Sequence, residues 1–159
     1  MTTKNIFIVA GITIAAAGFV IKDEIERLRS LFAQFKIAPI AIRNFSAKLN
    51  GFEPTMSFNM DLHFFNPTYQ NFVANGTLMI IKKLVFYDQS GNFIGVSDAN
   101  IRSLKVDANT GTTVKNVPIT LDAKMLIGAV AAMISNGLKP ENIKVEMIVS
   151  VLGLEYVIK

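Results

Sequence analysis

The chain has 159 residues, the length of one ordinary domain and enough to bury a hydrophobic core without disulfides. Hydrophobic residues make up 51% of it and charged residues 18%, a balance that excludes an intrinsically disordered chain. The net charge of +4 is dispersed along the sequence and does not indicate a nucleic-acid-binding protein. Because there is no cysteine, disulfide frameworks, thiolate metal sites and cysteine nucleophiles are excluded.

The apolar residues concentrate near the N-terminus. The run Ile6 to Ile21 extends for 16 residues without a charge between Lys4 and Lys22. As a helix it would rise roughly 24 Å, a little short of a hydrocarbon core of about 30 Å, and a snorkelling Lys22 can extend it. Lys4, the apolar run and the small residues Ala15 to Ala17 also fit a secretory signal peptide. We expect an uncleaved anchor or docking helix, with a cleaved leader as the alternative.

Residues 22–36 continue this segment with helical amphipathicity. No proline interrupts residues 5–36, so we predict one long N-terminal helix that ends before Pro39. The apolar face could pack on the protein's own globular part, lie in a membrane interface or contact neighbouring copies. The positions that form this face follow the i, i+3, i+4 spacing and are Ile25, Leu28, Leu31, Phe32 and Phe35.

From residue 40 onward the apolar period changes from 3.6 to 2, which predicts a β domain. Phe58, Met60, Leu62 and Phe64 alternate with polar residues, and further strands are expected at 77–87, 93–96, 101–106, 117–121 and 143–151. Residues 88–92 fit a hairpin loop, and two lysines within 77–87 indicate an exposed edge or a bulge. Residues 123–134 fit a short late helix. The predicted fold class is therefore mainly β, an antiparallel sandwich with one short helix, preceded by the long N-terminal helix.

Several sequence elements together resemble a known family. These elements, in chain order, are Phe58 to Phe65 followed by Asn66-Pro67, then Leu84 to Tyr87, Ser90-Gly91, Gly95-Val96-Ser97, Val117-Pro118-Ile119 and Gly153-Leu154-Glu155-Tyr156. Residues 40–159 are thereby similar to the globular second type of late embryogenesis abundant proteins, which share the water stress and hypersensitive response (WHy) domain. The resemblance implies an immunoglobulin-like sandwich, no conserved catalytic set and a link to desiccation and stress protection. It also implies relatives in bacteria, archaea and phages, often behind a hydrophobic N-terminus.

The candidate site residues favour a structural interpretation. In Asn66-Pro67 the proline ends strand pairing and the asparagine can bond to its own backbone and begin a turn. His63 lies two residues from Asp61, but without a second histidine, a cysteine or a nucleophile elbow we interpret it as a surface histidine. Acidic residues at 88, 98 and 107 fall in separate predicted loops, where solvated carboxylates are the default over a Ca²⁺ site. We predict no catalytic, cofactor-binding or metal-binding residues, and no cofactor.

Basic and aromatic residues could form either a nucleic-acid surface or a partner surface. Phe58, Phe64 and Phe86 fall in the apolar register and are expected in the core, which leaves no base-stacking platform. Phe65, Tyr69 and Phe72 cluster around the Asn-Pro turn, where they are either exposed as a partner surface or buried. The basic residues that could form a patch are Lys82, Lys83, Arg102, Lys105 and Lys115.

These observations predict two parts, an N-terminal anchor or assembly arm over residues 1–36 and a β domain over residues 37–159 that folds alone. The expected function is a non-enzymatic structural or interaction module, held by its N-terminal helix on a membrane or in a large assembly such as a phage virion. The expected partners are the lipid bilayer, neighbouring chains or further copies of this chain, and no nucleic acid. The alternative is an exported soluble domain for stress protection or small apolar ligands, with a cleaved leader. Basic residues after the apolar run favour a cytoplasmic β domain, whereas export-type anchors argue for the other side, so the orientation stays open.

Overall fold

The computed structural model describes residues 26–27, 30–31, 33–48, 55–76, 79–122, 139–151 and 153–158. Strands account for 75% of these residues, and the pairing between them is antiparallel. The strands are β1 (Lys36–Lys48), β2 (Thr55–Asn66), β3 (Phe72–Asn75), β4 (Met79–Asp88), β5 (Phe93–Ile101), β6 (Ser103–Val106), β7 (Thr110–Asp122), β8 (Ile143–Val151) and β9 (Leu154–Ile158), and a short 3₁₀ turn, η1 (Pro140–Asn142), precedes β8.

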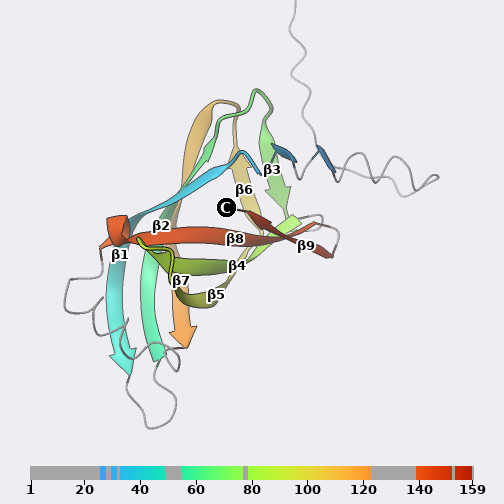
Figure 1. The fold of residues 1–159 in the computed structure, drawn as a ribbon. Coiled ribbons are helices and arrows are strands. Elements are labelled where there is room, and N and C mark those ends of the chain that lie inside the picture. The colour runs from blue at the N-terminus through green and yellow to red at the C-terminus, as the bar shows by residue number, and fades with distance from the viewer. Residues whose placement is uncertain are drawn as a thin grey trace, which may run out of the picture.

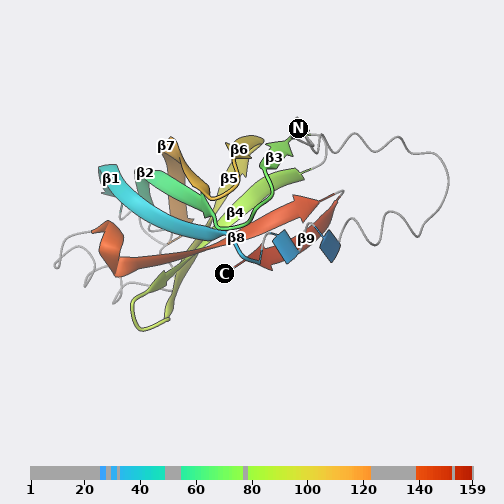
Figure 2. The same cartoon turned by 90° about the horizontal axis from the view of Figure 1, so that it is seen from above.

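The strands form three sheets. The orders are β1-β2-β7, β5-β4-β8-β9 and the two-stranded pair β3-β6. Figures 1 and 2 show the three-stranded and four-stranded sheets as two layers, with β3 and β6 at one end. This arrangement agrees with the layered β architecture expected from the period-2 pattern.

The core lies between the two layers, where alternate residues of β2, β4 and β8 point into it. Along β2, Met56, Phe58, Met60, Leu62 and Phe64 are all buried. On the facing sheet the buried residues include Leu84, Phe86, Val145, Met147 and Val149, and the rings of Phe58 and Phe86 meet edge to face with centroids 6.3 Å apart. Full burial of each such side chain contributes about 1.5–3 kcal/mol, so this core is the main source of stability.

The Gly95-Val96-Ser97 element joins the two layers at one side. A Cβ added at Gly95 would lie 3.2 Å from Cδ2 of Leu121, so glycine permits the close approach of β5 to β7. The buried Ser97 hydroxyl accepts a hydrogen bond of 3.0 Å from the backbone N–H of Thr120 and donates one of 3.2 Å to the carbonyl of Asp98. The sequence pattern that carried the family resemblance thus has a local structural role in this chain.

The expected long N-terminal helix is wrong. Among the described residues no helix reaches seven residues, and β1 begins at Lys36 instead of following a helix that ends near Pro39. Only Glu26, Arg27, Ser30 and Leu31 are helical in the described part of this region. The apolar run Ile6 to Ile21 and the predicted late helix over 123–134 lie outside the described residues. Within the described ranges, no helix is both long and apolar enough to cross a membrane.

The last residues before β1 are built into the core. Leu31 and Phe35 are buried, and the Phe35 ring contacts that of Phe72 at the start of β3, with centroids 4.8 Å apart. Of the alternatives for the amphipathic face, this part of it therefore packs on the protein's own β domain. The division of the chain at residue 36 stays a prediction. The buried side chains of Leu31 and Phe35 lie on the N-terminal side of this boundary.

Candidate functional site

The turn after β2 is organised by the side chain of Asn66, which is fully buried. Its Oδ1 accepts hydrogen bonds from the backbone N–H and the hydroxyl of Thr68, at 3.0 and 2.7 Å. Its Nδ2 donates to the carbonyls of Gln70, Val106 and Asp107, at 2.7, 3.3 and 3.4 Å. The turn predicted from the Asn-Pro dipeptide is confirmed, and the amide also reaches a second segment that the sequence did not indicate.

That second segment is the connection between β6 and β7. The backbone N–H of Asn109 donates to the carbonyl of Thr68 at 3.0 Å, and the N–H of Ala108 donates to Oδ1 of Asn71 at 2.9 Å. Asn109 has a φ of 54°, the left-handed region that asparagine tolerates better than most residues. The turns at 66–71 and 107–109 are therefore fixed to each other at one end of the domain.

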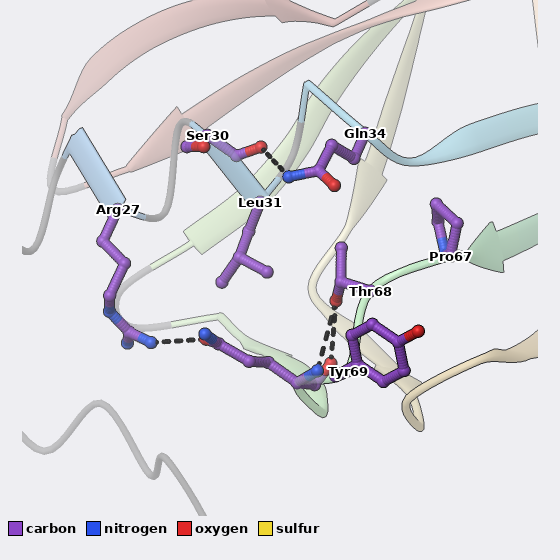
Figure 3. A pocket seen from close by; sticks show the side chains of 8 residues that line it. Arg27, Ser30, Leu31, Gln34, Pro67, Thr68 and Tyr69 are labelled. Atoms are coloured by element: carbon purple, nitrogen blue, oxygen red, sulfur yellow. Dashed lines mark hydrogen bonds between the residues drawn. The ribbon is translucent and has the colours of Figure 1, made fainter.

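A pocket of about 370 Å³ opens between the 66–70 turn and the segment that precedes β1 (Figure 3). Arg27 closes one side by donating from Nη1 to Oε1 of Gln70 at 2.7 Å. Gln34 donates to the backbone carbonyl of Ser30 at 3.1 Å, which holds the chain at the opposite wall. The lining residues are Arg27, Ser30, Leu31, Gln34, Pro67, Thr68, Tyr69 and Gln70.

The described residues that line the pocket offer hydrogen-bonding groups and one charge, with no nucleophile and general base paired among them. Its polar groups are a guanidinium, hydroxyls and amides, which supply hydrogen-bond donors and acceptors. Tyr69 stands beside it with 92% of its surface exposed, although the turn that carries it is rigidly bonded. Of the aromatic cluster expected around this turn, Phe72 is buried and Tyr69 is exposed.

A second polar centre joins the three strands of the β1-β2-β7 sheet. Asp61 of β2 is buried and pairs with Arg43 from β1. Nη1 of Arg43 lies 2.9 Å from Oδ1 of Asp61, and Nη2 lies 2.8 Å from Oδ2. Oδ1 of Asp61 also accepts from the backbone N–H of Asn116 at 2.8 Å. Asn44 and Asn116 have φ of 55° and 56° where the pairing of β1 and β7 with β2 shifts register. These two bulges let both neighbouring strands direct donors at one carboxylate.

The donors around Asp61 give its stability contribution a defined pH dependence. The Asn116 N–H, followed by Arg43, holds the pKa of Asp61 below the usual 3.8. A depressed folded-state pKa stabilises the protein above the unfolded-state value, and this contribution is lost as the pH falls through the folded-state value. We expect Asp61→Asn to lower the thermal midpoint at neutral pH, and the difference from the unchanged protein to shrink below pH 3.8. Thermal melts across pH 7 to 3 test this, with the exposed Asp98→Asn as control; a pH-independent difference would contradict it.

His63 and Asp61 do not act as a pair. Nδ1 of His63 lies 3.2 Å from Oγ1 of Thr113 on β7, while Asp61 faces Arg43 and Asn116. The imidazole lies so close to Gly111 that a Cβ there would collide with it. His63 is half-buried between its neighbours on β7, and each member of the candidate pair is thus engaged by different groups.

The candidate acidic residues lie apart. Asp88 closes the β4–β5 hairpin by accepting from the side chain and backbone of Asn92, both at 2.8 Å, and these bonds lower the pKa of Asp88. Asp98 lies within β5, and Asp107 pairs with Lys105 at 3.4 Å beside the β6–β7 turn. Within the described ranges, no group of three acidic or histidine side chains is placed to hold a metal ion.

The candidate basic residues also fall on different sheets. Lys82 and Lys83 belong to β4, Lys105 to β6 and Lys115 to β7. Lys82 pairs with Glu155 of β9 at 2.8 Å, and this bond lowers the pKa of Glu155. On the same sheet, burial raises the pKa of Tyr87, and so does the hydrogen bond of 3.1 Å that its hydroxyl donates to Glu146.

Sequence reasoning missed three of the side chains described above, which are Arg43, Arg27 and Gln70. Arg43 was not singled out because its partner lies 18 residues away, across a strand pair with irregular register. Arg27 and Gln70 are separated by 43 residues, and no local pattern connects them. The available signal was weak: the asparagines at the two bulges are the residue type that most readily adopts a positive φ.

Comparison with known proteins leaves the family open. No protein-family model matches the chain, and no curated protein matches it. A solved structure described as "Crystal structure of protein from Archaeoglobus fulgidus" is similar over 76% of this chain and 89% of that chain, with 11% sequence identity and a TM-score of 0.32. The resemblance to the WHy-domain family stays a prediction that rests on the sequence elements quoted above.

Proposed function

We propose that the protein is a non-enzymatic structural or interaction module, carried on a membrane by its apolar N-terminal segment, Ile6 to Ile21. The observation that carries the proposal is the connection between that segment and the β domain. The chain that leaves the apolar run becomes part of the domain core by Leu31 and Phe35. A partner that holds the apolar run would thereby hold the β domain at a fixed end.

The use of the polar side chains supports the non-enzymatic part of the proposal. Three buried side chains are of types that can take part in catalysis, namely Asp61, Asn66 and Ser97. Each of them makes hydrogen bonds that join strands or turns. In the part of the chain that the structure describes, every buried side-chain nitrogen and oxygen has a hydrogen-bond partner. Groups committed in this way serve to fix the fold.

A charge in the apolar run tests the membrane part. We expect the full chain to float with lipid vesicles, and Ile14→Asp to weaken this binding about 100-fold, because an acid at the bilayer centre costs about 3 kcal/mol relative to isoleucine. Ile14→Leu is the matched control and should bind as the unchanged chain does. Equal flotation of Ile14→Asp would contradict a membrane role.

Two further results would redirect the proposal. Sedimentation of the full chain as a large particle without lipid would favour an assembly such as a virion in place of a membrane. Mass spectrometry of the protein from its native source reports the N-terminus directly. A mature chain that starts near Gly18 would contradict the anchored module and favour the exported soluble domain.

A further inference from the structure

The surface beside the pocket carries an exposed aromatic residue, Tyr69. We define the Tyr69 surface by Arg27, Tyr69 and Gln70. Tyr69 is 92% exposed, whereas Phe72, three residues later, is 3% exposed. The turn is held by the Asn66 and Thr68 bonds, so the ring is presented to solvent from a rigid support. Because the backbone of the turn is already ordered, a partner that covers the ring has to order only the side chain.

The covalent chain limits how far this surface can lie from the apolar run. Six residue steps separate Ile21 from Arg27, and a chain spans at most about 3.6 Å per residue, so the two positions are within about 22 Å in any conformation. Nη1 of Arg27 is 2.7 Å from Oε1 of Gln70, which adjoins Tyr69 in the turn. Ile21 therefore lies within about 22 Å of a residue that contacts the turn that carries Tyr69.

We propose that the Tyr69 surface faces the bilayer and that Tyr69 inserts into the lipid headgroup region. This inference rests on the proposed membrane function and adds to it the orientation of the β domain. Tyrosine suits that region because its ring is apolar and its hydroxyl is polar, and tyrosines gather at membrane interfaces. Arg27, whose guanidinium bonds Gln70, places a positive charge beside it.

The opposite end of the domain provides the contrast. The hairpin between β4 and β5 lies away from the segment that carries Arg27 in both views (Figures 1 and 2). Phe93, at the start of β5, is 46% exposed there and contacts Tyr87 with ring centroids 6.1 Å apart. If the Tyr69 surface faces the bilayer, the exposed ring of Phe93 stays in water.

The chain contains no tryptophan, so a single introduced indole reports its own surroundings. We would bind full-length Tyr69→Trp and Phe93→Trp to vesicles that contain lipids brominated near the headgroup. We expect Tyr69→Trp to shift its emission to shorter wavelength and to be quenched severalfold more than Phe93→Trp. Matching thermal midpoints for the two variants would show that both are folded.

Each other outcome overturns the inference. Vesicle-bound protein in which neither indole is quenched would place the β domain away from the lipid. Equal quenching of both indoles would remove the proposed orientation. A shift of Tyr69→Trp without quenching would mean that a protein chain covers the surface instead of lipid. If the full chain does not float with vesicles at all, the proposed function fails first, and the inference falls with it.

Discussion

Asn66→Ala is expected to lower the free energy of unfolding by about 3–4 kcal/mol, because it removes the five hydrogen bonds of a fully buried amide at once. The amide bonds the N–H of Thr68 and the carbonyls of Gln70 and Val106, and it links the turn after β2 to the end of β6. A buried group that is left without a partner costs about 1–3 kcal/mol. The sum is reduced because the Gln70 carbonyl still accepts a hydrogen bond from the Thr68 hydroxyl. Chemical denaturation measures the loss.

Two variants separate the role of the amide from that of the turn in general. Asn66→Asp keeps the acceptor for Thr68 but loses the donor to three carbonyls, so it should also be strongly destabilised. Asn71→Ala in the same turn removes the hydrogen bond that Asn71 accepts from the N–H of Ala108 and should cost about 1 kcal/mol. If Asn66→Ala and Asn71→Ala cost the same, Asn66 does not organise this end of the domain.

Phe35→Ala is expected to destabilise the protein by about 3–5 kcal/mol, the usual cost of removing a buried phenylalanine ring. Phe35 is 2% exposed, lies one residue before β1 and packs edge to face on Phe72. The loss should appear as a lower denaturation midpoint in the full-length protein.

Phe45→Ala is the matched control because Phe45 lies in β1 but is 39% exposed. It should change stability far less than Phe35→Ala. Similar losses for the two variants, or no loss for Phe35→Ala, would show that the residues before β1 do not belong to the core.

Strand positions were largely predictable because alternation is a local signal. The expected strand at 143–151 coincides with β8, and the one that begins at Phe58 is the middle of β2. The pair of lysines in β4 indicated an edge or a bulge, and the register shift between Ile81 and Lys83 shows a bulge in a central strand. Strand β1 was missed, since none of its residues is buried and its sequence therefore alternates weakly.

The N-terminal helix was mispredicted because helical spacing does not report the partner of a segment. Leu31 and Phe35 are four residues apart and both are buried, as an amphipathic helix requires. A single helical turn followed by a strand satisfies the same spacing. The strand that follows begins with the pairing of Lys36 with Phe65, a contact across 29 positions that no local pattern contains.

The candidate site was predictable only where its chemistry is local. Asn66 was found because an asparagine before proline bonds its own turn, and that bond is present. The Arg43–Asp61 pair needs two bulges and three strands in register, so it could be recognised only once β1, β2 and β7 were aligned. The contact between Arg27 and Gln70 likewise depends on the tertiary fold.

We infer that the chain up to Phe35 belongs to the β domain and that the apolar run is joined to the domain by a packed connection. The most direct measurement compares thermal unfolding, followed by circular dichroism, for chains that comprise residues 26–159 and 37–159. The longer chain keeps Leu31 and Phe35 and should unfold at the midpoint of the full-length protein, whereas the shorter one should unfold at a clearly lower temperature or aggregate. Equal midpoints for the two chains would contradict the claim and support a separable arm that ends at residue 36.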